Sequence, residues 1–82
     1  MSEKIFGDVV IWAGASELGG GYFPIISVRR GDDQSLHAVI RDQNYITLEL
    51  AHDAAKDAVS KITSIDNANV LKFSDGSSLQ AA

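Results

Sequence analysis

The strongest pattern along the chain is a pair of apolar-rich runs, YFPIISVRR and SLHAVIR, that flank the turn cluster Gly31-Asp32-Asp33. Apolar residues that alternate with other residues on both sides of such a cluster are typical of a β-hairpin. Residues 22–41 are therefore predicted to form two antiparallel strands, and the rest of the chain is predicted to be arranged around them.

The register of this hairpin follows from the alternation of side chains along a strand, because a slip of one residue changes which residues share a face. Pairing Val28 with Leu36 and Ile26 with Ala38 gathers apolar side chains on one face, which carries Tyr22, Pro24, Ile26, Val28, Leu36, Ala38 and Ile40. Since Pro24 has no N–H donor, its strand is predicted to be an edge strand or to be bulged there.

The opposite face of the hairpin is mixed in character. In the same register it carries Phe23, Ile25, Ser27, Arg29, Ser35, His37, Val39 and Arg41. Directly opposed residues on adjacent strands interact, so Ser27 is predicted to lie opposite His37 and Phe23 opposite Arg41, where a cation–π contact is available.

The segment before the hairpin predicts one further strand. Residues 8–13, DVVIWA, are rich in Val, Ile and Trp, with Val10 and Trp12 on one face. Residues 1–7 are predicted to be frayed, and residues 14–21, GASELGGG, to be a flexible connection. This glycine-rich segment has no lysine and precedes a strand, so it does not match a phosphate-binding loop.

The segment after the hairpin predicts an amphipathic helix over residues 48–62. Thr47 has the side chain of a helix N-cap, and Glu49 falls in the first turn, where the helix dipole favours a carboxylate. An apolar stripe with helical period runs along one side of this segment, through Leu48, Ala51, Ala55, Ala58, Val59 and Ile62.

The final part of the chain predicts a loop over residues 63–69, a strand over residues 69–73 and a turn over residues 74–77. Residues 78–82 are predicted to pair briefly or to fray. The whole chain is then a single α+β domain over residues 1–82, with the element order β-β-β-α-β. An antiparallel three- to four-stranded sheet carries one amphipathic helix packed on one face.

A single helix covers a single face, so the mixed face of the sheet needs another explanation. In one alternative, the C-terminal segment folds back and covers it with Ile65, Val70, Leu71 and Phe73. In a second, two copies pack these faces together or extend the sheet edge to edge. In a third, the face binds another protein or a nucleic acid. The predicted interaction surface consists of Trp12, Phe23, Ile25, Arg29, His37, Val39 and Arg41.

The composition of the chain limits which partners and which kinds of catalytic or metal-binding site are expected. The formal net charge of −4 disfavours nucleic acid and anionic membranes as partners. The chain has no cysteine, which excludes a thiol nucleophile and a cysteine-ligated zinc site. His37 and His52 belong to no metal-binding or catalytic spacing that we recognise. We therefore expect no catalytic, cofactor-binding or metal-binding residues.

The sequence predicts a small non-catalytic protein-interaction or regulatory module that acts through the mixed face or the sheet edge as a homodimer. Its expected partner is itself or another protein. The alternatives are a nucleic-acid-associated accessory protein that uses the same face, and a small enzyme or ligand binder with its site at a dimer interface. No signal peptide or membrane span is evident, so a cytoplasmic location is expected.

Overall fold

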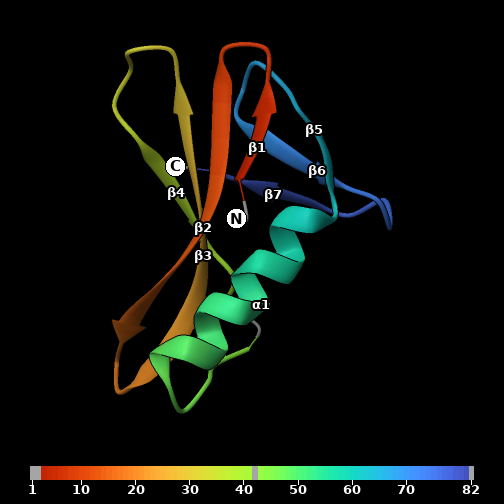
Figure 1. Ribbon diagram of the computed structural model, residues 1–82. Helices are drawn as coiled ribbons and strands as arrows, with labels where there is room; N and C mark the ends of the chain where they lie inside the picture. The colour runs from red at the N-terminus through yellow and green to blue at the C-terminus, as the bar shows by residue number, and fades with distance from the viewer. Residues whose placement is uncertain (1–2, 42, 82) are drawn as a thin grey trace.

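The computed structural model describes residues 3–41 and 43–81, and it confirms the α+β class (Figure 1). An antiparallel four-stranded sheet has the order β1-β2-β3-β4, and a second sheet has the order β5-β6-β7. The strands of the first sheet are β1 (Glu3–Phe6), β2 (Val9–Leu18), β3 (Gly21–Arg30) and β4 (Leu36–Val39). Helix α1 (Leu48–Ser60) precedes the second sheet, which contains β5 (Ile62–Ile65), β6 (Val70–Phe73) and β7 (Ser78–Gln80).

The predicted register of the central hairpin is confirmed. Val28 pairs with Leu36 and Ile26 with Ala38, so the apolar side chains of β3 and β4 share one face. Because β3 pairs with strands on both sides, Pro24 does not lie on an edge strand.

Strand β3 is not bulged at Pro24 either, because its register with β2 runs unbroken through the pair Ala15–Pro24; instead, its pairing with β4 ends there. Ile40 donates its N–H to the Pro24 carbonyl at 3.0 Å, and the chain then leaves β3. It returns at Tyr45, whose N–H and C=O bond to the backbone of Tyr22 at 2.8 and 3.1 Å. Proline has no N–H to offer the neighbouring strand, so this is where the ladder is weakest.

The glycine-rich segment is not the flexible connection that the sequence indicated. Strand β2 continues through Leu18, and only Gly19 and Gly20 form the turn. Both glycines have positive φ angles, 60° and 87°, as a two-residue hairpin turn of this kind requires. The small residues before them are held in the sheet because β3 supplies a full-length partner.

Strands also lie near both ends of the chain: β1 falls within residues 1–7, which were predicted to fray, and β7 confirms the brief pairing that was one alternative for residues 78–82. Strand β1 pairs with residues 9–12 of β2, and β7 pairs with β6. The Lys4 ammonium donates at 2.9 Å to the carbonyl of Ser60, which the helix end leaves without a helical partner, and at 2.7 Å to the carbonyl of Ile62 in β5. Residues 1, 2 and 82 lie outside the described residues.

Helix α1 begins as predicted and ends two residues earlier than expected, at Ser60. The Thr47 hydroxyl accepts a hydrogen bond from the Leu50 N–H at 3.1 Å, an N-cap that contributes about 1 kcal/mol. Ala51, Ala55 and Val59 are buried and form the face that packs on the sheet. The small alanines let the helix backbone lie close to β2 and β3.

The second sheet was only partly predicted. The strand expected over residues 69–73 is β6, and β7 is the brief pairing expected as one alternative for residues 78–82, but β5 occupies part of the expected loop. The Asp66 carboxylate accepts hydrogen bonds from the Val70 and Ala68 N–H groups at 3.0 and 2.9 Å. These bonds, with Lys72 and Arg30 nearby, hold the pKa of Asp66 below its usual range.

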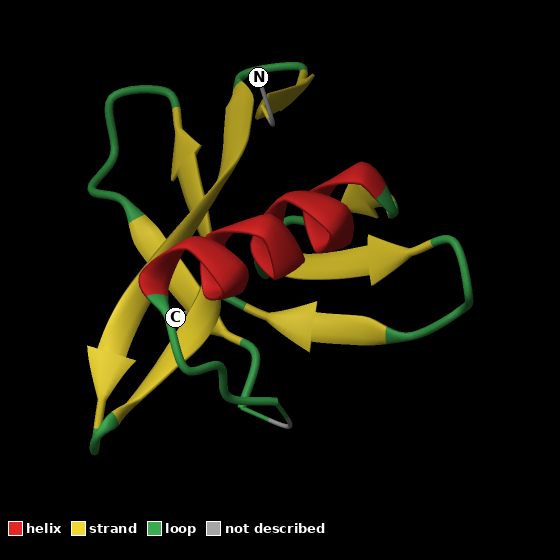
Figure 2. Cartoon of the chain, turned by 60° about the horizontal axis from the view of Figure 1, so that its bottom comes forward, coloured by secondary structure: helices red, strands yellow, loops and turns green. Residues whose placement is uncertain are grey.

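A single core joins the two sheets and the helix. In Figure 2, the helix crosses the four-stranded sheet, and the three-stranded sheet lies beside both. The buried core cluster consists of Val9, Ile11, Ile26, Val28, Ala38, Val59, Ile62, Leu71 and Ala81. The residues of the first sheet in this cluster all come from the face that the hairpin alternation predicted to be apolar.

Candidate functional site

The other face of the four-stranded sheet is the candidate site. We call it the open face and define it by the side chains of Val10, Trp12, Phe23, Ile25, Ser27, Arg29, His37 and Val39. The strand register places these residues in rows across the sheet. Trp12, Ser27 and His37 are neighbours in one row, and Ile25 lies beside Val39 in the next.

The structure does not adopt the alternative in which the C-terminal segment covers this face. Leu71 belongs to the buried core cluster on the helix side of the sheet, and Ile65 and Phe73 pack against that same cluster. None of the open-face residues belongs to the cluster or to the side chains packed on it. Both the helix and the second sheet therefore cover one side of the first sheet.

The exposure of the two faces differs accordingly. Ile11 and Ile26, on the covered face, are fully buried. On the open face, Trp12, Phe23, Ile25 and Val39 are only half-buried, while Arg29 and His37 are exposed. The half-buried residues are crowded by neighbouring strands, and their outer surfaces remain accessible. A mixed apolar and basic surface of this kind usually marks a contact site.

Ser27 and His37 form a polar pair within this surface, as the register predicted. The Ser27 hydroxyl lies 2.9 Å from Nδ1 of His37, and Ser27 is 5% exposed. A catalytic pair needs a third group that orients the imidazole and donors that stabilise the oxyanion. Within the described part of the chain, no side chain bonds to the second ring nitrogen of His37. The contact thus satisfies the buried hydroxyl and positions the imidazole.

Arg29 and Arg41 differ from most other cations of the chain, because neither guanidinium bonds to any residue that the structure describes. Most of the other basic side chains are held by internal partners: Lys4 by the carbonyls of Ser60 and Ile62, Arg30 by Asp66 and Asn69, Lys56 by Asp53, and Lys61 by Asp57. Arg29 stands beside Val10 on the open face. It is available to an external anion.

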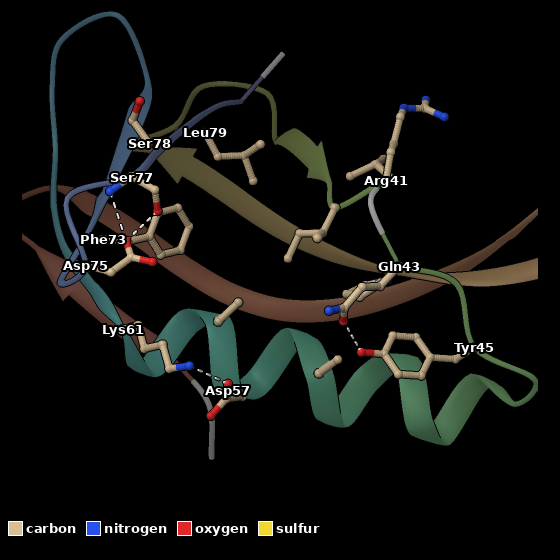
Figure 3. A pocket seen from close by; sticks show the side chains of 15 residues that line it. Arg41, Gln43, Tyr45, Asp57, Lys61, Phe73, Asp75, Ser77, Ser78 and Leu79 are labelled. Carbon is tan, nitrogen blue, oxygen red and sulfur yellow. Dashed lines mark hydrogen bonds and ion pairs between the residues drawn. The ribbon is translucent and has the colours of Figure 1, made fainter.

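Arg41 lies at the margin of the open face. The described ladder between β3 and β4 ends before Arg41, so the predicted pairing with Phe23 is not present in it. Arg41 follows the end of β4 and lines a cleft beside that strand (Figure 3). Of the seven residues predicted to form the interaction surface, the other six lie on β2, β3 and β4 and share the open face.

The cleft is the second candidate, with a volume of about 630 Å³. It lies between the end of β4, helix α1 and the β6–β7 hairpin, and Pro24, Ile40 and Ala58 are among its apolar lining residues (Figure 3). The sequence did not predict this cleft, because its walls combine the predicted hairpin, helix and last strand with segments predicted to be loops or turns, and only the tertiary fold brings them together. Only the missing N–H of Pro24 indicated that the strand pairing near this cleft would be irregular.

The polar groups around the cleft are largely bonded to one another. Lys61 lies 3.0 Å from Asp57, and Tyr45 donates to Gln43. The Ser77 hydroxyl donates to Asp75, and this bond lowers the pKa of the Asp75 carboxyl. A binding pocket selects its ligand through polar groups that the ligand satisfies. Since these groups already satisfy each other, the cleft is a weaker candidate than the open face.

Nowhere in residues 3–41 and 43–81 do three or more His, Asp or Glu side chains gather as a metal site would require. Within the same residues, no helix has the length and apolar character needed to span a bilayer.

Comparisons with protein-family models, with curated proteins and with solved structures found no match to this chain.

Proposed function

We propose that this protein is a small non-catalytic interaction module that binds a partner protein through the open face. The observation that supports this most strongly is the packing of the second sheet. It adds its apolar side chains to the core that the helix already covers. The helix and the second sheet therefore both cover one face of the first sheet. Partly accessible apolar side chains remain on the other face, namely Trp12, Phe23, Ile25 and Val39.

The chemistry of the face defines the kind of partner. Its centre offers aromatic and aliphatic side chains, and Arg29 and Arg41 provide cations on the face and at its margin. Tryptophan and arginine are the residues that most often dominate the energy of protein interfaces. We expect the partner to place apolar side chains on Trp12 and Ile25 and a carboxylate near Arg29.

Single-stranded nucleic acid is the runner-up, because aromatic side chains beside arginine suit base stacking and phosphate binding. Three features favour protein. The net charge is −4, Asp32 and Asp33 lie in the loop that joins β3 to β4, and Glu3 occupies the same row as Trp12. Each of these repels a phosphate backbone. A cytoplasmic location is part of the proposal, since a chain without cysteine gains nothing from an oxidising compartment.

Site-specific photo-crosslinking in the native cell tests this proposal. A photoreactive residue at position 25 should crosslink one defined protein, whereas the same residue at the exposed position 63 of the second sheet should not. Crosslinking of nucleic acid at position 25 would favour the runner-up. Equal labelling from both positions, or none from position 25, would refute the open face as a binding surface.

Trp12→Glu should weaken binding of the crosslinked partner by about 30-fold or more, which is typical of losing a central tryptophan. It introduces a charge where the partner places apolar groups, and it lies outside the core. The matched control is Lys72→Glu, on an exposed position of β6. Isothermal titration calorimetry measures both affinities, and thermal unfolding confirms that both variants fold. Unchanged affinity in the Trp12 variant would contradict the proposal.

A further inference from the structure

The outer edge of β2 has a stretch without a described partner strand. Strand β1 pairs only with residues 9–12, whereas β2 runs to Leu18. Beyond this pairing, the outer edge of β2 is clear of other ribbons in Figure 2. Exposed strand edges of this kind are templates for pairing with another chain.

The direction of the free backbone groups follows from the two hairpins of β2. Phe6 pairs with Val9 across one two-residue turn, and Leu18 pairs with Gly21 across the other. Hydrogen bonding alternates between the sides of a strand, so the odd-numbered residues of β2 bond toward β1 and the even-numbered residues toward β3. The N–H and C=O groups of Ala15 and Glu17 therefore point outward, and no described residue bonds to them.

An exposed apolar side chain, Leu48, lies beside this edge. A cavity of about 510 Å³ is lined by Ala15 of β2 and by Leu48, Glu49 and His52 at the start of α1. Leu48 is 52% exposed, and Ile46 and Leu50 nearby in the chain are 86% and 46% exposed. These are three of the few large apolar side chains that the described surface exposes, and a strand added at Ala15 would cover Leu48.

We infer that two copies of this chain join edge to edge through β2, in antiparallel register centred on Ser16. This deepens the proposed function and rests on it, because the union places two open faces on one continuous sheet. In this register Ala15 of one copy pairs with Glu17 of the second copy, and each such pair exchanges both of its N–H···O bonds. The contact is two-fold symmetric and uses the same surface twice.

The choice of register follows from charge and from β1. A register centred on Glu17 would set two like charges directly opposite each other, which is unfavourable. A register centred on Ala15 would bring Leu18 of the second copy opposite Trp12, where Glu3 of β1 already pairs. The register centred on Ser16 avoids both conflicts. The small side chains of Ala13, Gly14, Ala15 and Ser16 present no bulk to the approaching strand.

A second copy suits this edge better than an unrelated peptide does. The part of β2 beyond its pairing with β1 can pair with an identical stretch from a second copy. The two stretches have equal length and small side chains, and their outward N–H and C=O groups come into register. Pairing also relieves a weakness of small domains, whose cores bury little surface and which are often stabilised by oligomerisation. On the open side of the sheet, the union makes a surface that can hold a partner at two equivalent sites, which raises avidity without new contacts.

Sedimentation equilibrium tests the inference with a pair of variants at one position. The wild type should sediment at twice the mass of one chain, and Ala15→Val, which keeps the outward N–H, should do the same. Ala15→Pro removes an N–H to which no described residue bonds, and edge strands tolerate proline where the N–H side faces outward, so this variant should fold and sediment as a monomer. A monomeric wild type, or a dimeric and folded Ala15→Pro variant, would overturn the inference.

Ser16→Cys gives an independent test if Ala15→Pro does not fold. In the proposed register the two Ser16 residues face each other in a pair that is not hydrogen-bonded, with Cα atoms about 4.5 Å apart, within the range of a disulfide. Mild oxidation should therefore link the Ser16→Cys dimer, while Thr63→Cys on the second sheet should remain unlinked. No linkage in the Ser16 variant would overturn the inference. Trp12→Glu should remain dimeric while losing its partner, which separates failure of the dimer from failure of the proposed function.

Discussion

Ile26→Ala should lower the free energy of unfolding by about 3–4 kcal/mol, whereas Ile25→Ala should lower it by about 1 kcal/mol or less. The two isoleucines are adjacent on β3 and differ in the face they occupy. Ile26 is fully buried beneath the helix, and Ile25 lies half-buried on the open face. Chemical denaturation followed by circular dichroism measures both values, and each variant is the matched control of the other.

The size of this difference tests the assignment of the two faces. For a domain of this length, the loss at position 26 corresponds to a fall in melting temperature of about 20 °C. If the alanine variant is too unstable to analyse, Ile26→Val and Ile25→Val make the same comparison at about 1 kcal/mol and close to zero. Equal losses at the two positions, or a larger loss at position 25, would show that the open face is in fact packed.

Leu71→Ala should lower the free energy of unfolding by about 3 kcal/mol, because Leu71 is fully buried in the core that joins the two sheets. Leu50→Ala is the control, since Leu50 is 46% exposed and its truncation should cost about 1 kcal/mol or less. The second sheet shares the core with β2, β3 and α1. The variant should therefore unfold in one transition that is seen alike by Trp12 fluorescence and by far-ultraviolet circular dichroism.

The coincidence of the two probes is the informative part of this experiment. Trp12 reports on the first sheet, which is remote in sequence from Leu71. If residues 62–81 formed an independent unit, Leu71→Ala would melt that unit alone and leave the fluorescence transition where it is in the wild type. Two separated transitions would contradict the single core described here.

The central hairpin and the helix could be predicted because the sequence pattern that specifies each of them lies entirely within the residues that form it. Period-two alternation leaves one register that keeps Ile26, Val28, Leu36 and Ala38 on a single face. Thr47 supplies the helix N-cap, and the alanine-rich stripe after it has helical period. Local patterns of this kind predict structure when packing and hydrogen bonding agree with them.

The short strands could not be predicted, because their stability comes from their partners. EKIF and ITSI are four-residue segments with exposed polar positions, and a segment this short has no period to measure. Strand β1 is held by the edge of β2, and β5 is held by β6. In β2, the pairing with β3 overrides the low strand propensity of Gly14 and the alanines around it.

The residues that share the open face could be predicted from the sequence. The sequence could not predict whether the C-terminal segment would pack on that face. Alternation along β2, β3 and β4 places Trp12, Phe23, Ile25, Arg29, His37 and Val39 together. The destination of Leu71 and Phe73 depends on the path of the chain after the helix, which alternation does not encode. Arg41 left the predicted ladder because the interruption next to Pro24 redirects the chain.

The accessibility of Trp12 tests the central claim most directly, because the chain contains one tryptophan and it lies on the open face. Acrylamide quenching of its fluorescence compares the free protein, the partner complex and the denatured chain. The edge-to-edge dimer leaves Trp12 uncovered, so quenching should be substantial in the free protein and should fall when the partner binds. An emission in the free protein that resists acrylamide like a buried indole would show that something within the chain or a second copy already covers this face.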